Sequence, residues 1–276
     1  MSGDYAQTVA ISGAASGLGA ALTSHYANLG WRIAVTDQDE AGAERQLEAI
    51  RQNGGDGFAM RLDVTSTADW QQLKQNVLSQ WGGLGVLVNN AGVAAGGNVE
   101  DTPLEDWQWV LDIDLMGVIR GCHEFLGMFK QQGRGHIVNI ASFAAMAGAA
   151  DIAAYGTAKA GVYALSEAMR SDLHGTGIGV SVVCPAFFKT GLMATFRSAD
   201  PEADRTRVTR WMEKSGITAE GVSAEIFKAV ESNRFLVLTH PETRWAWRIK
   251  RWLPGLYFRI LVKQSKSLSR REEGAG

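Results

Sequence analysis

Short runs of β-branched and apolar residues alternate with longer segments of helical periodicity along most of this sequence. The apolar runs predict strands at 8–12, 32–37, 58–64, 86–92, 136–142, 179–185 and 234–239. The segments between them predict helices at 17–29, 39–53, 66–81, 104–130, 152–174 and 218–231. Strands that are apolar on both faces and separated by helices indicate a mostly parallel sheet covered on both sides. The sequence therefore predicts an α/β fold with a doubly wound parallel sheet, whose carboxyl edge is the expected place for a ligand site.

The chain is expected to form one domain with a C-terminal extension. Its 276 residues, of which 46% are hydrophobic and 20% charged, suffice for a sizeable core. We find no internal repeat and no low-complexity linker. We expect the domain to span 1–240, with a long strandless excursion at 186–216 that serves as a substrate loop. Residues 241–276 form a basic, Trp-rich extension.

Composition excludes several classes of function. A formal net charge of −2 gives no overall attraction to nucleic acid. Cys122 and Cys184 lie far apart, without a CxxC motif, so no metal site is expected and a reducing compartment is favoured. The N-terminal residues lack the pattern of a signal peptide, and no apolar run approaches the roughly 18 residues that span a bilayer. We therefore expect a cytoplasmic protein.

A glycine-rich turn joins the first expected strand to the first expected helix. In "VAISGAASGLGAAL", Gly13, Gly17 and Gly19 allow close backbone approach to a ligand, with Ser16 and Leu18 between them. The helix that follows offers free N–H groups to a pyrophosphate. The spacing is GxxxGxG rather than GxGxxG, so a turn without a ligand remains the alternative.

Two carboxylates end the next strands. Asp37 closes the second strand, where it can accept hydrogen bonds from both ribose hydroxyls of an adenosine and repel a 2′-phosphate. No Arg or Lys lies within the glycine turn or directly after Asp37, so NAD is favoured over NADP. Asp63, followed by Val64, closes the third strand. Its carboxylate suits either a helix N-cap or a contact to adenine.

Ser142, Tyr155 and Lys159 stand in a stretch otherwise built of Ala, Gly and small apolar residues. Tyr155 and Lys159 are four residues apart on an expected helix and share one face, and Ser142 ends the preceding strand. Buried polar groups require partners, so the three form either a reactive cluster or a satisfied polar part of the core.

At these residues the chain resembles the short-chain dehydrogenase/reductase family, from about residue 6 to 240. The matching pieces are "SGAASGLG" (12–19), "NNAG" (89–92), Ser142, "YGTAK" (155–159) and "CPAFFKT" (184–190). The resemblance implies a Rossmann-type fold and an NAD(P)-dependent oxidoreductase acting on CH–OH groups.

The resemblance also implies roles for individual residues. Tyr155 would be the acid/base, Lys159 would lower its pKa and bind the nicotinamide ribose, and Ser142 would polarise the substrate oxygen. The cofactor would be lined by Asn90, Ala91, Gly92 and Pro185, and Thr190 would hold the carboxamide. Family members commonly pair through helices equivalent to 104–130 and 152–174. A homo-oligomer, a dimer or a homotetramer, is therefore expected, favoured by a small-residue face made by Ala153, Ala154, Ala158, Ala160 and Gly161.

Three positions depart from the family pattern. Ser12 replaces Thr and keeps a hydroxyl, and Ala186 replaces the Gly of a "PG" turn. Asp114 in "VLDIDLMGV" replaces an Asn whose backbone carbonyl holds a water in a proton relay. We expect Asp114 to serve through its main-chain carbonyl, because an uncompensated carboxylate there would oppose ionisation of Tyr155.

Substrate choice is expected to come from Val93–Val99, Phe143, Ala144 and the 186–216 excursion. The excursion carries four arginines but shows no obvious clamp for an anion, and its apolar residues are Phe187, Phe188, Leu192, Met193, Phe196, Trp211 and Met212. They suit either the packing of a lid or an apolar pocket, and we favour a hydrophobic secondary alcohol or ketone. The alternatives are an NADPH-dependent ketone or ketoacyl reductase and a non-catalytic dinucleotide sensor.

The tail combines Arg244, Arg248 and Arg251 with Trp245 and Trp252 until Pro254-Gly255 interrupts it. It suits packing over the substrate site or against another subunit, or contact of residues 244–263 with an anionic membrane surface. Nucleic-acid binding is the least favoured role.

Overall fold

The computed structural model describes residues 5–188, 191–199, 202, 206, 208, 209 and 215–273, with side chains up to residue 263. A parallel sheet has the strand order β3-β2-β1-β4-β5-β6-β7. The strands are β1 (Thr8–Ser12), β2 (Arg32–Asp37), β3 (Asp56–Arg61), β4 (Val86–Asn89), β5 (Gly135–Ile140), β6 (Ile178–Val183) and β7 (Leu236–Val237). This order is that of the Rossmann-type doubly wound sheet, so the predicted fold class is confirmed.

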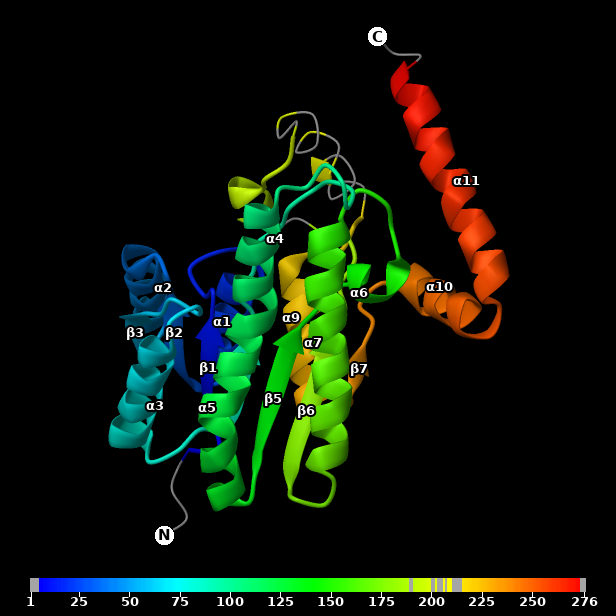
Figure 1. Cartoon of the computed structure of the whole chain (residues 1–276). Coiled ribbons are helices and arrows are strands. Elements are labelled where there is room, and N and C mark those ends of the chain that lie inside the picture. The colour runs from blue at the N-terminus through cyan, green and yellow to red at the C-terminus, as the bar shows by residue number, and fades with distance from the viewer. Residues whose placement is uncertain are drawn as a thin grey trace.

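Helices cover both faces of the sheet, and two separate cores result (Figure 1). One face packs against α3 (Thr67–Trp81), α5 (Gly117–Gln132) and α7 (Ala153–Asp172). The other packs against α1 (Gly17–Asn28), α2 (Glu40–Gln52) and α9 (Ala219–Glu231). Every residue of β1 and β4 is buried, as expected for strands with apolar side chains on both faces.

Local signals in the sequence place the helix ends. The side chains of Asp39, Ser66 and Thr218 accept backbone N–H groups at the starts of α2, α3 and α9. Gly82 and Gly133 end α3 and α5 with positive φ angles of 73° and 65°, which glycine adopts without strain. Because Ser66 is the N-cap of α3, the N-cap alternative for Asp63 is wrong.

The expected helix at 104–130 contains a π-helical turn. The segment comprises α4 (Leu104–Leu111), the π-turn η1 (Asp112–Met116) and α5. A π-turn widens a helix by one residue and often marks a functional position. Asp114 lies on this turn and is completely buried.

Part of the small-residue face of α7 is used inside the subunit. Ala154 and Ala158 are buried in a cluster with Val110, and a side chain at Gly161 would contact Leu115 of the π-turn. Ala154 and Ala158 are therefore not available to a second subunit, contrary to our expectation, whereas Gly161 is only partly buried. The homo-oligomer itself stays a prediction.

The C-terminal extension forms two helices beyond the sheet. α10 (Pro241–Trp252) packs beside the short helix α6 (Ala144–Ala147), and α11 (Pro254–Glu273) follows at the predicted Pro254-Gly255 break (Figure 1). Among the described residues, no helix is both long and apolar enough to cross a bilayer.

Candidate functional site

A cavity of about 1350 Å³ lies at the carboxyl ends of the strands. Most residues predicted to form the site line it, namely Gly13, Ser16, Gly17, Leu18, Asp37, Asp63, Val64, Asn90, Ala91, Gly92, Ser142, Tyr155, Lys159 and Pro185. Gly19 and Asp114 lie behind its wall. Thr190 lies outside the described residues, as do Arg205, Arg207, Arg210, Trp211 and Met212 of the excursion.

The glycine turn and the "NNAG" turn are held against each other. The backbone amides of Asn90 and Ala91 donate to Ser12 Oγ at 3.0 and 3.1 Å, and Asn90 Nδ2 donates to the carbonyls of Ser12 and Gly13 at 2.9 and 3.0 Å. Gly13 has a φ of 66°, and a Cβ there would lie 2.8 Å from Ala91 Cα. A glycine is therefore required where the two turns meet. The hydroxyl of Ser12 joins the turns by accepting both amide hydrogen bonds.

The start of α1 leaves backbone donors beside the cavity. Its N-cap Ser16 has an extended backbone and its side chain makes no capping hydrogen bond. A Cβ at Gly19 would come within 2.8 Å of Asn90 Nδ2, so this glycine permits close packing under the turn. Uncapped helix N-termini attract anions, and this one fits the pyrophosphate of a dinucleotide.

Asp37 and Asp63 present their carboxylates at the same end of the cavity. Asp37 accepts from the amides of Ala15 and Asp39 at 2.9 and 3.0 Å, which fixes the carboxylate between two loops. Asp63 accepts from the amide and hydroxyl of Thr65 at 2.9 and 2.7 Å. Among the described residues that line the cavity, Lys159 is the one Lys or Arg. Both carboxylates thus lie where hydrogen-bond acceptors for the adenosine part of a dinucleotide are expected.

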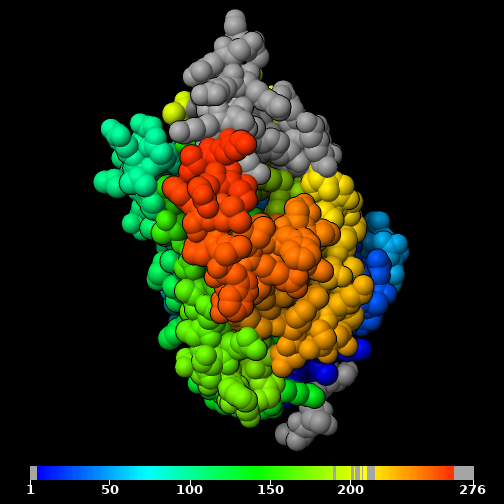
Figure 2. Space-filling model, turned by 90° about the vertical axis from the view of Figure 1, so that its right-hand side faces the viewer, coloured from blue at the N-terminus to red at the C-terminus, as the bar shows by residue number. Residues whose placement is uncertain are grey.

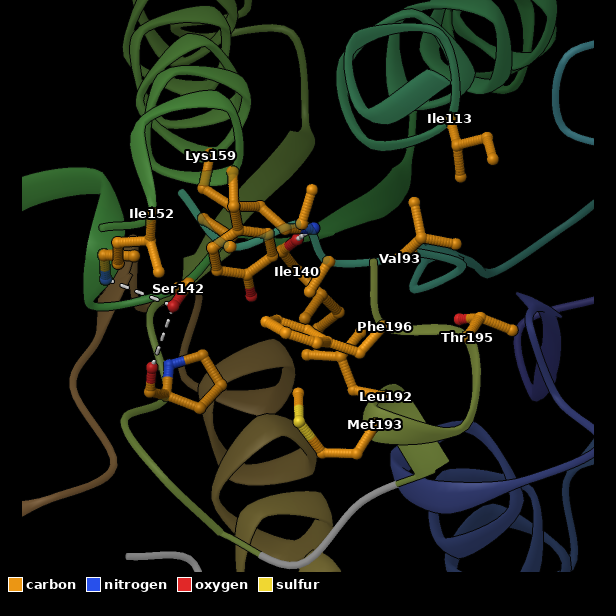
Figure 3. A pocket seen from close by; sticks show the side chains of 18 of the residues that line it. Val93, Ile113, Ile140, Ser142, Ile152, Lys159, Leu192, Met193, Thr195 and Phe196 are labelled. Atoms are coloured by element: carbon orange, nitrogen blue, oxygen red, sulfur yellow. Dashed lines mark hydrogen bonds between the residues drawn. The ribbon is translucent and has the colours of Figure 1, made fainter. Parts of the chain in front are cut away.

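The polar cluster lies on another part of the cavity wall, where Figure 3 labels Ser142 and Lys159. Ser142 Oγ accepts from the amide of Ala144 at 3.1 Å and faces the carbonyl of Pro185 at 3.5 Å. Lys159 Nζ donates to the carbonyl of Ile140 at 3.1 Å and lies 5.7 Å from the centre of the Tyr155 ring. The structure therefore brings Ser142, Tyr155 and Lys159 together, as predicted.

Asp114 contacts this cluster through its side chain, which corrects our expectation. Its Oδ2 lies 3.0 Å from Lys159 Nζ, and its Oδ1 accepts from the amide of Val93 at 2.8 Å. A Cβ at Gly92 would lie 3.3 Å from Lys159 Nζ and 3.4 Å from both Asp114 carboxylate oxygens. The carboxylate is thus compensated by an ammonium and an amide, under a glycine that leaves room for the pair.

The two charges act on Tyr155 in opposite directions. Burial raises the pKa of Tyr155, the Lys159 ammonium lowers it, Asp114 raises it, and the net change is upward. Burial by itself lowers the pKa of Lys159, but Asp114 and Tyr155 reverse this and the pKa rises. Burial raises the pKa of Asp114, and Lys159 and the Val93 amide oppose that rise. Lys159 is therefore held as a cation whose effect on Tyr155 is partly cancelled by Asp114.

The rest of the cavity is mainly apolar. Val93, Phe143 and Ala144 line it together with residues of the excursion, namely Phe187, Phe188, Leu192, Met193 and Phe196. Figure 3 shows Leu192, Met193 and Phe196 on the side of the cavity that faces Ser142. The segments that we expected to choose the substrate thus lie at the cavity.

The C-terminal extension supplies part of the cavity wall, which agrees with the alternative that the tail packs over the substrate site. Phe258, Leu261 and Val262 of α11 line the cavity, in the i, i+3, i+4 spacing of an apolar helix face. Lys250 Nζ donates to the carbonyl of Met146 at 2.6 Å, and Tyr257 Oη donates to that of Ala147 at 2.9 Å. Both bonds tie the extension to α6, close to Ser142.

The family model for short chain dehydrogenases matches residues 7–201. The chain belongs to the short-chain dehydrogenase family. This short-chain dehydrogenase is 31% identical over 254 residues to the probable oxidoreductase EphD of Mycobacterium tuberculosis, covering 89% of the chain and 43% of EphD. The chain thus spans less than half of EphD's length.

Two further comparisons cover most of both partners. The short-chain dehydrogenase is 32% identical over 188 residues to a 3-oxoacyl-[acyl-carrier-protein] reductase of Synechocystis, covering 68% of the chain and 76% of the relative. The crystal structure of a short chain dehydrogenase/reductase from Burkholderia phymatum in complex with NAD matches with a TM-score of 0.86 and 30% identity, over 91% of this chain and 94% of that one. The geometry of the glycine turn and the similarity to these proteins therefore both support a dinucleotide site.

Proposed function

We propose that the chain is an NAD-dependent dehydrogenase that interconverts an apolar secondary alcohol and its ketone, with Tyr155 as the acid/base. The observation that carries the proposal is the position of Ser142, Tyr155 and Lys159 within an apolar cavity beside a dinucleotide-type glycine turn. A non-catalytic sensor would need no such cluster. A bound nicotinamide would supply the hydride acceptor or donor.

The residues of the site would carry out proton transfer, stabilise the developing charge and bind the substrate. Tyr155 takes a proton from the alcohol oxygen in oxidation and returns it to the ketone oxygen in reduction. Ser142 donates a hydrogen bond to the same oxygen and stabilises the charge that develops on it. Lys159 keeps a positive charge beside the phenol, and Asp114 keeps Lys159 protonated. The apolar walls hold the carbon skeleton and exclude water.

The proposed cofactor preference rests on Asp37. Its carboxylate faces the cavity without a Lys or Arg among the other described lining residues at that end, and it would repel a 2′-phosphate. The relative from Burkholderia phymatum was crystallised with NAD. An NADPH-dependent ketoacyl reductase is the second candidate, favoured by similarity to the 3-oxoacyl-[acyl-carrier-protein] reductase of Synechocystis.

The test is the Tyr155→Phe variant assayed with NAD and a panel of apolar secondary alcohols. We expect wild-type NADH formation and a loss of about 10³-fold or more in kcat for the variant, because only the phenolic proton carrier is removed. NAD binding should stay near wild type by calorimetry. A variant that keeps a substantial rate would show that the acid/base lies elsewhere. Turnover of acyl-carrier ketones with NADPH alone would favour the second candidate.

A further inference from the structure

The outward side of α10 and the start of α11 exposes apolar and basic side chains together. We name this surface the α10–α11 face, and its residues are Trp245, Arg248, Arg251, Trp252, Leu253 and Leu256. Trp245, Trp252 and Leu253 are 64%, 76% and 55% exposed. Exposed tryptophans in one patch are uncommon on a surface that meets only water. Figure 2 shows α10 and α11 in orange and red, side by side on one face of the molecule.

The inward side of the two helices already provides their attachment. Thr243 is buried, Trp247 packs against the core, and Lys250 and Tyr257 bind the carbonyls at the end of α6. The guanidinium of Arg251 also lies 5.7 Å from the centre of the Trp247 ring, but Trp245, Arg248 and Trp252 are not needed to hold the helices on the domain. Attachment to the domain therefore does not explain why these side chains are exposed.

Charge indicates what covers the face. Residues 243–263 hold six of the chain's 27 Lys and Arg residues and none of its 29 Asp and Glu residues, although the whole chain has a net charge of −2. The guanidinium of Arg248 lies 5.2 Å from the centre of the Trp245 ring. Tryptophan and arginine together suit the headgroup region of a bilayer, where the rings lie at the boundary and the cations meet lipid phosphates.

We propose that the α10–α11 face rests on the surface of an anionic lipid bilayer. The helices lie on the membrane rather than across it, since α10 has only 12 residues and α11, with 20, is not apolar enough to cross a bilayer over its described residues. The surface continues to the cavity through Phe258, which is 63% exposed and also lines the cavity with Leu261 and Val262. Docking thus brings the apolar wall of the cavity close to the lipid.

The test is sedimentation of the full-length protein with vesicles of phosphatidylcholine alone and of phosphatidylcholine mixed with phosphatidylglycerol. We expect about tenfold tighter binding to the mixed vesicles, weakened by high salt. The Trp245→Ser/Trp252→Ser and Arg248→Gln/Arg251→Gln variants should each lose most of this binding. Matched controls on other surfaces, Leu29→Ser/Leu104→Ser and Lys130→Gln/Lys228→Gln, should keep it. Thermal melting shows that each variant is folded.

Equal binding to both kinds of vesicle, or to neither, would overturn the proposal. So would an equal loss of binding in the control variants. A second copy of this chain is the other partner that could cover the face. Light scattering without lipid tests for it by measuring the oligomeric state. If the tryptophan variants dissociate an oligomer that the controls preserve, the α10–α11 face is a subunit interface and the membrane proposal is wrong.

Discussion

Asp114 Oδ2 lies 3.0 Å from Lys159 Nζ, and both side chains are almost completely removed from solvent. The pair sits directly behind Tyr155, and each of its charges changes the pKa of that phenol. The family pattern has a neutral amide at position 114, so this chain places one more negative charge in the cluster. The Tyr155–Lys159 pair and Asp114 must be treated as one titrating unit, because their charges interact at short range.

Asp114→Asn should lower the first macroscopic pKa of the Tyr155–Lys159 pair. Removing the carboxylate destabilises the protonated, positively charged pair, whether the proton then leaves the phenol or the ammonium. A shift of one pH unit corresponds to about 1.4 kcal/mol, and we expect a shift of about that size. The measurement is the pH dependence of kcat/KM for alcohol oxidation, whose acidic limb should move to lower pH.

Glu44→Gln provides the control for that experiment, because Glu44 is an exposed carboxylate on α2. Its pH profile should coincide with that of the wild type. An Asp114→Asn profile that also coincides with the wild type would mean that position 114 acts through its main-chain carbonyl alone.

Lys159→Met should destabilise the fold by about 3–5 kcal/mol, since it leaves Asp114 buried without its cation. Adding Asp114→Asn to it should recover a large part of that loss. Denaturant unfolding followed by tryptophan fluorescence measures both changes. Lys74→Met is a matched control, because the side chains of Lys74 and its partner Glu124 stay 31% and 15% exposed and its loss should cost clearly less than that of Lys159. A double variant as unstable as Lys159→Met would show that packing, not charge, sets the cost.

The sequence predicted the fold and the cluster because their signals are local. Alternating apolar runs, the glycine turn and the four-residue spacing of Tyr155 and Lys159 can each be seen within a short window. The partner of Asp114 could not be found in this way, because Lys159 lies 45 residues away and the π-turn that buries Asp114 leaves no periodic signal. For the same reason, the sequence allowed the tail to pack over the substrate site but could not name the residues of α11 that do so. Its apolar spacing shows a helix face but not which cavity the face meets.

Wild-type enzyme should show a higher kcat/KM with NAD than with NADP. Asp37→Ser combined with Gln38→Arg should reverse the preference, because it removes the repulsive carboxylate and adds a cation at a residue that lines the cavity. The two efficiencies should be measured on the same alcohol for both proteins. A wild-type preference for NADP would show that Asp37 does not contact the ribose.

The α11 wall should affect binding of the substrate more than its conversion. Leu261→Ala/Val262→Ala removes apolar carbon from the cavity wall and leaves Ser142, Tyr155 and Lys159 in place, so we expect to lose contacts that the substrate makes equally before and during reaction. Each buried methylene contact contributes about 0.8 kcal/mol, so we expect KM for a long apolar alcohol to rise about fivefold or more with kcat nearly unchanged. A short alcohol that does not reach α11 should show little change.

Ile260→Ala is the matched control on the same helix, because Ile260 is exposed and is absent from the cavity lining. A double variant that lowers kcat for long and short alcohols alike would instead mean that α11 positions α6, through Tyr257, and not the substrate.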